Sequence, residues 1–194
     1  MPELDSTLGA ALLGTFTASI LYGVTSVQTF LYFHDSRNDG RFLKSLVLFL
    51  WILDTIHLGF TYHGLYFYLV TNFGNFAVLL SPTWSILAQV YITTISDLIV
   101  RGVFSRRVSL LCGPRRMLAF FLPVFIMTLS LLVFACGCAF ASRAFILGTY
   151  AKMNEAASML YTSLGAAAVA DTVIAVSLCS LLIQSRTGFK GYEH

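Results

Sequence analysis

Three ionisable side chains, Asp54, His57 and Asp171, fall inside long apolar stretches of this sequence. An Asp at the centre of a membrane-spanning helix costs on the order of +2.5 to +3.5 kcal/mol on insertion scales, so such residues usually face the interior of a helix bundle. Asp54 and His57 are spaced i and i+3 and therefore share one helix face. The three residues could bind a cation, a proton or a polar ligand. Alternatively, neighbouring hydroxyls and carbonyls satisfy each of them, and they only fix helix packing.

Two further charged residues, Asp97 and Arg101, are spaced i and i+4 near the end of another apolar stretch. The acid precedes the base, which is the better orientation for an ion pair on a helix. We therefore predict a structural ion pair rather than a ligand site. Polar residues also recur every fourth position before this pair, at Ser85, Gln89 and Thr93. Such a stripe should face other helices and hydrogen-bond to them.

The remaining chemistry-bearing residues do not form a catalytic or metal-binding pattern. Cys136 and Cys138 lie two residues apart within an apolar stretch, but no further thiolate or imidazole is placed to complete a metal site. The sequence contains no glycine-rich phosphate loop, no Ser/His/Asp arrangement and no H-E-x-x-H motif. We therefore expect no enzyme activity, no catalytic residue, no bound metal and no cofactor.

Composition indicates that most of the chain lies in lipid. Of the 194 residues, 57% are hydrophobic and only 11% are charged, and the mean hydropathy is +0.80. A soluble domain has roughly 25% charged residues. The apolar excess is gathered into blocks of about 20 residues or more, the length that a helix needs to cross a bilayer. The sequence thus predicts a multi-pass integral membrane protein.

Five apolar blocks are separated by short polar segments. In lipid a segment must satisfy its own backbone hydrogen bonds, so each block is predicted to be a helix. The expected fold is an all-α bundle of five transmembrane helices forming a single domain over residues 1–194. The predicted helices cover about residues 8–33, 42–70, 84–103, 117–141 and 157–184.

The distribution of basic residues predicts the orientation of the helices, because Lys and Arg concentrate on the cytoplasmic side. Of the 12 basic residues, only Arg143 and Lys152 fall on the opposite side. The N-terminus is therefore expected outside and the C-terminus in the cytoplasm. The basic inner residues are Arg37, Arg41, Lys44, Arg101, Arg106, Arg107, Arg115, Arg116, Arg186 and Lys190.

Expected partners follow from this charge pattern. The basic stretch at 101–116 should contact anionic lipid headgroups rather than nucleic acid. Small residues recur every fourth position at Ala10, Gly14 and Ala18, and again around Asp171, a pattern typical of close helix contacts. These small residues could also pack against a second copy of the chain, so a homo-oligomer is possible. The sequence does not distinguish the plasma membrane from an endomembrane.

Several segments resemble one family. They are LGTFTASILYGVTSVQTFLYF, LFLWILDTIHLGFTYHGLYFYLVTNFGN, SRRV and ADTVIAVSLCSLLIQSRTGF, and together they run over nearly the whole chain. They are similar to fungal multi-spanning membrane proteins named for a domain of unknown function, family 6534. The resemblance implies seven helices with an outside N-terminus, so this chain looks truncated after its fifth helix. It does not point to a particular activity, because none is established for the family. The positions that match the family pattern are Asp54, His57, Asp171, Arg186 and Gly188.

Three functions fit these observations. The outside N-terminus and the basic inner loops favour a receptor- or sensor-like protein. The acids and the histidine at mid-helix favour a transporter or channel-like protein instead. A non-catalytic membrane scaffold is the third alternative, because the same polar residues can simply join helices.

Overall fold

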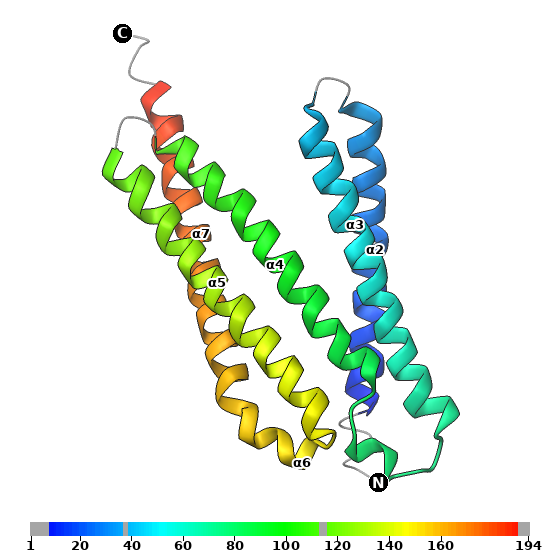
Figure 1. The fold of residues 1–194 in the computed structure, drawn as a ribbon. Helices are drawn as coiled ribbons and strands as arrows, with labels where there is room; N and C mark the ends of the chain where they lie inside the picture. Colours follow the sequence, from blue (N-terminus) through cyan, green and yellow to red (C-terminus); the bar gives the residue numbers. More distant parts are fainter. Residues whose placement is uncertain (1–7, 37–38, 113–115, 190–194) are drawn as a thin grey trace. The chain divides into compact units, whose positions relative to one another are not determined.

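A computed structural model describes residues 8–36, 39–112 and 116–189 of the chain. The described residues are almost entirely helical and contain no β-strand. Five segments are long and apolar enough to cross a membrane. The long helices are α2 (Ala10–Asp35), α3 (Arg41–Tyr66), α4 (Trp84–Leu111), α5 (Arg116–Leu147) and α7 (Ala157–Phe189), and the short ones are η2 (Phe67–Thr71), η3 (Val78–Leu80), α6 (Tyr150–Met153) and η4 (Asn154–Ala156) (Figure 1).

The prediction of five long apolar helices is confirmed, but three of them extend further than expected. The helix expected at 84–103 continues to Leu111, because Arg106 and Arg107 are good helix formers whose side chains can remain exposed. The helix expected to end at residue 141 continues to Leu147 and stops before Gly148, whose φ of 63° few other residues adopt. The last helix continues past residue 184 to Phe189.

The chain divides into two compact units, and the boundary lies within α4. The first unit comprises the residues up to Ile92 together with Gly148–Ala151, and the second comprises Thr93–Leu147 and the residues from Lys152 onward. In the first unit α2 and α3 pack side by side (Figure 1). Hydrogen bonds between side chains join them at three levels, which fixes their register. They are Ser19 Oγ to Tyr62 Oη at 2.7 Å, Tyr22 Oη to Thr55 Oγ1 at 2.8 Å and Trp51 Nε1 to Ser26 Oγ at 3.1 Å.

The first unit also holds the start of α4 against α3. An added Cβ at Gly64 would lie 3.1 Å from Ile86 Cγ1, so the glycine permits close packing here. His63 Nδ1 lies 2.9 Å from Ser85 Oγ, which is fully buried. The Tyr68 hydroxyl donates to the Ser81 carbonyl at 2.7 Å and accepts from the Thr83 amide at 2.9 Å. The connection between α3 and α4 is thereby tied to the end of α3.

In the second unit α5 packs against α7 and against α4. The Ser163 hydroxyl on α7 donates to the Val133 carbonyl on α5 at 3.2 Å. Gly137 on α5 lies directly against Thr94 on α4, since an added Cβ at this glycine would be only 2.5 Å from Thr94 Cγ2. Close approach at a glycine brings two helix backbones together and increases their van der Waals contact.

Pro123 lies inside α5, where it cannot donate the backbone hydrogen bond that the Ala119 carbonyl would otherwise accept. Ser109 on α4 fills this role, because its hydroxyl donates to the Ala119 carbonyl at 3.2 Å. A second hydroxyl, that of Ser105, donates to the Pro123 carbonyl at 3.2 Å. A side chain of the neighbouring helix thus satisfies the backbone carbonyl that the proline leaves free, which is one way in which prolines are accommodated in apolar surroundings.

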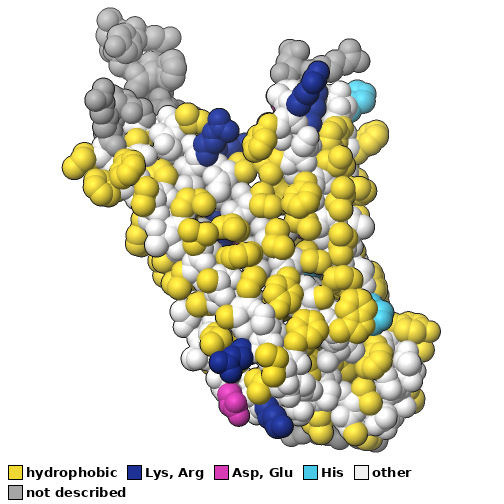
Figure 2. Space-filling view, in the orientation of Figure 1, with side chains coloured by type: hydrophobic (Ala, Val, Ile, Leu, Met, Phe, Trp, Pro, Cys, Tyr) yellow, Lys and Arg dark blue, Asp and Glu magenta, His cyan; other side chains and the backbone are white. Residues whose placement is uncertain are grey.

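The outer surface of each unit is mostly hydrophobic. In each of the five apolar segments, at most 17% of the most apolar window is buried inside the protein. Large side chains such as Ile20, Phe30 and Ile146 are 69–82% exposed. Hydrophobic side chains cover much of the face shown in Figure 2, and charged ones are few. Such a surface requires an apolar solvent, in agreement with the membrane prediction.

The close contact at Gly137 leads to a prediction about stability. Gly137→Ala should lower the free energy of unfolding by about 1–3 kcal/mol, because the added methyl group collides with Thr94 and forces the helices apart. The measurement is the thermal unfolding midpoint in a mild detergent. Gly165→Ala on α7 is the matched control, since its added Cβ meets no atom within 4 Å. Equal stability of the two variants would contradict the packing, and Thr94→Ala should partly rescue Gly137→Ala.

Candidate functional site

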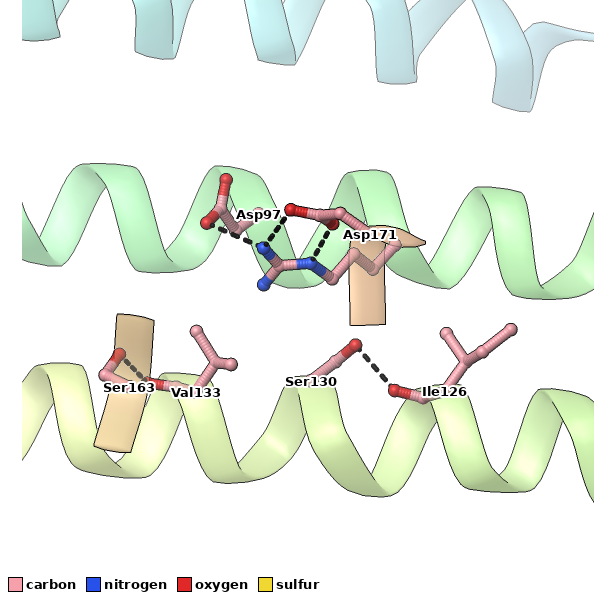
Figure 3. A network of polar contacts seen from close by, with 7 residues as sticks. Asp97, Ile126, Ser130, Val133, Ser163 and Asp171 are labelled. Atoms are coloured by element: carbon pink, nitrogen blue, oxygen red, sulfur yellow. Dashed lines mark hydrogen bonds and ion pairs between the residues drawn. The ribbon is translucent and has the colours of Figure 1, made fainter. Parts of the chain in front are cut away.

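A charged triad joins α4 to α7 in the second unit. The Arg101 guanidinium donates from Nε to Asp171 Oδ1 at 2.8 Å and from Nη2 to Asp171 Oδ2 at 3.1 Å. Its Nη2 also lies 3.4 Å from Asp97 Oδ2 on the same helix. Figure 3 labels the two acids, Asp97 and Asp171, and marks their contacts by dashed lines. The predicted pair of Asp97 and Arg101 is therefore present, but Asp171 is the closer, bidentate partner, a geometry typical of strong Arg–carboxylate pairs.

The triad lies near the middle of both helices. Asp97 is the fourteenth of the 28 residues of α4, and Asp171 is the fifteenth of the 33 residues of α7. The Arg101 side chain is only 6% exposed, whereas those of Asp97 and Asp171 are 40% and 61% exposed. Arg101 Nη1 is buried and has no hydrogen-bond partner among the described residues. Arg101 is thus a buried residue that holds two helices, and it does not belong with the exposed basic residues Arg106 and Arg107.

Asp54 and His57 lie in the first unit, on α3. Asp54 is the fourteenth of the 26 residues of that helix. No described residue forms a hydrogen bond or an ion pair with its carboxylate, and the same holds for the ring nitrogens of His57. Asp171 belongs to the second unit and is paired there with Arg101. The grouping of Asp54 and His57 with Asp171 therefore stays a prediction.

A cavity of about 680 Å³ lies within the first unit, a size typical of small-molecule sites. The N-terminal half of α2, the C-terminal half of α3 and the start of α4 form most of its wall, and η2, η3 and α6 contribute the rest. The lining residues are Leu8, Ala11, Gly14, Thr15, Ala18, His57, Thr61, Gly64, Leu65, Tyr68, Leu79, Ile86, Gln89 and Tyr150.

Most of this wall is apolar, but polar groups gather at two levels. His57 and Thr61 lie on the C-terminal half of α3, and Gln89 on the start of α4 donates from Nε2 to Thr61 Oγ1. Tyr68 and Tyr150 lie toward the other end, near the connection that follows α3. An apolar cavity with a few convergent polar groups is the usual form of a binding site for small organic molecules.

A second, smaller cavity of about 220 Å³ extends along α2 and α3 in the same unit. It shares Ala18 and His57 with the larger cavity, and Asp54 forms part of its wall. His57 therefore borders both spaces. The remaining lining residues are Leu21, Tyr22, Thr25 and Leu58.

Some of these features could be predicted from the sequence and others were missed. The polar stripe does face another helix at two positions, since Ser85 bonds to His63 and Gln89 bonds to Thr61. Within the described part of the first unit, Gly14 makes no close helix contact. An added Cβ there meets nothing within 4 Å, because this part of α2 opens onto the large cavity. Spacing alone cannot distinguish a small residue against a neighbour from one beside an empty space.

Several predicted positions lie outside the described part of the structure. Arg37, Arg115 and Lys190 are not described, and neither are the side chains of Arg116 and Arg186. Gly188 lies within the last turns of α7. The headgroup contacts expected of the basic set therefore stay a prediction.

Comparisons with known proteins add no assignment to this geometry. No family model matches the chain, and no curated protein or solved structure matches it. The candidate site is consequently defined by the residues themselves: the charged triad in one unit, and in the other the two cavities that meet at His57.

The triad generates a second prediction. Asp171→Asn should lower the free energy of unfolding by about 3 kcal/mol, because it leaves the buried Arg101 guanidinium with only the more distant Asp97. Chemical denaturation in detergent measures the loss. Asp97→Asn is the control and should cost less. Arg101→Leu combined with Asp97→Asn and Asp171→Asn removes all three charges and should recover most of the stability, and a triple variant no better than Asp171→Asn alone would contradict the role of the triad.

Proposed function

We propose that this chain is a multi-pass membrane protein of receptor or sensor type that binds a small, largely apolar molecule between α2, α3 and the start of α4. The observation that carries this proposal is the cavity of about 680 Å³, which is apolar apart from a few hydrogen-bonding side chains. A ligand that fits there contacts three long helices at once, so binding can change their packing and be sensed elsewhere in the protein.

The position of the cavity along the helices supports a receptor-like role. Its wall runs from Ala11 to Ala18 on α2, about 10 Å of helix, includes Leu8 just before this helix, and reaches the connection between α3 and α4 at Leu79. By the proposed orientation this end of the unit faces outside, because only Arg143 and Lys152 among the basic residues fall on that side. A ligand would therefore enter from the outer side or from the outer leaflet.

The remaining assignments also stay proposals. Membership of the fungal family 6534 and its seven-helix pattern rests on the sequence resemblance alone, and the absence of catalysis rests on the absence of a catalytic motif. The scaffold and the transporter or channel are the alternatives. Mid-helix carboxylates favour a transporter, but Asp97 and Asp171 are both engaged with Arg101, which favours a structural role for them.

A cavity-filling substitution tests the proposal directly. Gly14→Phe should place an aromatic ring in the large cavity without a backbone clash, because an added Cβ at Gly14 meets open space. The probe is a photoreactive decanol carrying a diazirine on its chain, added to the protein in phosphatidylcholine nanodiscs. In the unmodified chain we expect labelled peptides from α2 and α3 around Ala11 and Thr61, and in Gly14→Phe a loss of this labelling by about fivefold or more.

The matched control is Gly23→Phe on the same helix. An added Cβ at Gly23 also meets nothing within 4 Å, but this residue does not line the cavity. Gly23→Phe should retain the labelling at Ala11 and Thr61. Labelling spread evenly over the exposed faces of the helices, and unchanged by Gly14→Phe, would contradict a binding cavity.

Cysteine labelling tests the proposed orientation. In a chain without its native cysteines, Lys152→Cys should react with a membrane-impermeant maleimide in intact cells, because Lys152 is expected outside. Arg106→Cys should react only after permeabilisation. Both native side chains are exposed, so accessibility to the reagent depends on the side of the membrane. Reaction of Arg106→Cys in intact cells would show that the proposed orientation is wrong and that this residue lies outside.

A further inference from the structure

Two cavities of the first unit, those that share His57, together suggest the chemical class of the ligand. The larger one offers an apolar wall to the body of a molecule. The smaller one is lined by a carboxylate, that of Asp54, and the two share His57. A molecule with its body in the first cavity and one polar end beside His57 would bring that end toward Asp54, one helical turn further along α3.

The carboxylate of Asp54 pairs with no Lys or Arg among the described residues of the first unit. In the described part of the first unit the only Lys and Arg residues are Arg41 and Lys44, at the start of α3. They precede Asp54 by 13 and 10 residues, which corresponds to about 20 and 15 Å of helix rise. Neither forms an ion pair with it. A carboxylate near the middle of a membrane-spanning helix is costly unless it is paired, and the second unit pairs its two with Arg101.

Other groups around Asp54 are neutral or can adapt to a cation. The small cavity contains the hydroxyls of Tyr22 and Thr25, and Tyr22 already bonds to Thr55. The imidazole of His57 lies there too. A neutral imidazole accepts a hydrogen bond from an ammonium, so a cationic end group can bond to Asp54 and His57 together, whereas an apolar end group can bond to neither and an anionic one is repelled by the carboxylate of Asp54.

We propose that the ligand is an amphiphilic amine, with its ammonium group held by Asp54 and His57 and its apolar body in the large cavity. This inference rests on the proposed binding function and names the ligand class of the same site. The same ammonium–carboxylate pair forms from either starting state. An ammonium can bind the carboxylate directly, or a neutral amine can take the proton of a protonated carboxyl group. Asp54 is exposed on its helix, so the proposed membrane rather than the protein would keep water from this ion pair. An ion pair is stronger in such apolar surroundings than in water, so it gives selectivity for the amine.

Competition between molecules with the same chain tests the ligand class. Decylamine, 1-decanol and decanoic acid are each added to the nanodisc-embedded full chain before labelling with the photoreactive decanol. The three competitors partition into the bilayer to different extents. Each competitor is therefore compared only with itself, between two variants of the protein, so its partition is the same in both measurements. We expect that the concentration of decylamine that halves the labelling is on the order of tenfold lower for the unmodified chain than for Asp54→Asn. The competition by 1-decanol should be unchanged.

Further variants separate the charge from the shape of the site. Asp54→Glu keeps the carboxylate and should retain part of the amine selectivity, and His57→Leu should weaken amine competition while leaving the labelling by photoreactive decanol in place. Equal competition by decylamine in the unmodified chain and in Asp54→Asn, with cavity labelling intact, would overturn the amine inference alone. Failure to label the cavity at all in the unmodified chain would overturn the proposed binding function as well, so the two failures are distinguishable.

Discussion

An apolar solvent leaves the backbone with a single way to satisfy its N–H and C=O groups locally, and the rest of this structure follows from that constraint. It explains why the described residues are almost all helical and why so little of the apolar surface is buried inside the protein. It also explains how the helices are joined. Since burying apolar side chains against each other gains little in lipid, the contacts rely on hydroxyl hydrogen bonds, glycines and one ion triad.

In apolar surroundings a charged side chain needs a partner, and the acids of the two units differ in whether they have one. In the second unit one guanidinium serves two carboxylates, and the more distant carboxylate is the one on the same helix. Arg101 is therefore best understood as the centre of a helix junction. Among the residues of the first unit that the structure describes, Asp54 has no such partner, although it occupies a similar position along its helix. Acids at similar positions along their helices thus differ in what satisfies them. This difference is the reason why we assign a structural role to Asp97 and Asp171 and propose a binding role for Asp54.

Much of the fold could be predicted from the sequence, because long apolar blocks have only one stable form in lipid. The ends of the helices could not, since Arg106 and Arg107 continue a helix as readily as they form a loop. The pair of Asp97 and Arg101 was predictable because both residues lie on one helix with fixed spacing. The partner Asp171 was not, because its distance from Arg101 depends on the register between two helices. The cavity beside Gly14 was also beyond prediction, since the same small residue fits a tight contact and an open space equally well.

The proline in α5 has a consequence for how this sequence can change over evolutionary time. The Ser109 hydroxyl is needed at the Ala119 carbonyl only because residue 123 lacks an amide hydrogen. A change at position 123 to any other residue would restore the hydrogen bond within the helix and relax selection on Ser109. A loss of Ser109 first would leave the carbonyl unsatisfied until the proline is also replaced. In related sequences the two positions should therefore vary together, and the order of their substitutions should favour loss of the proline before loss of the serine.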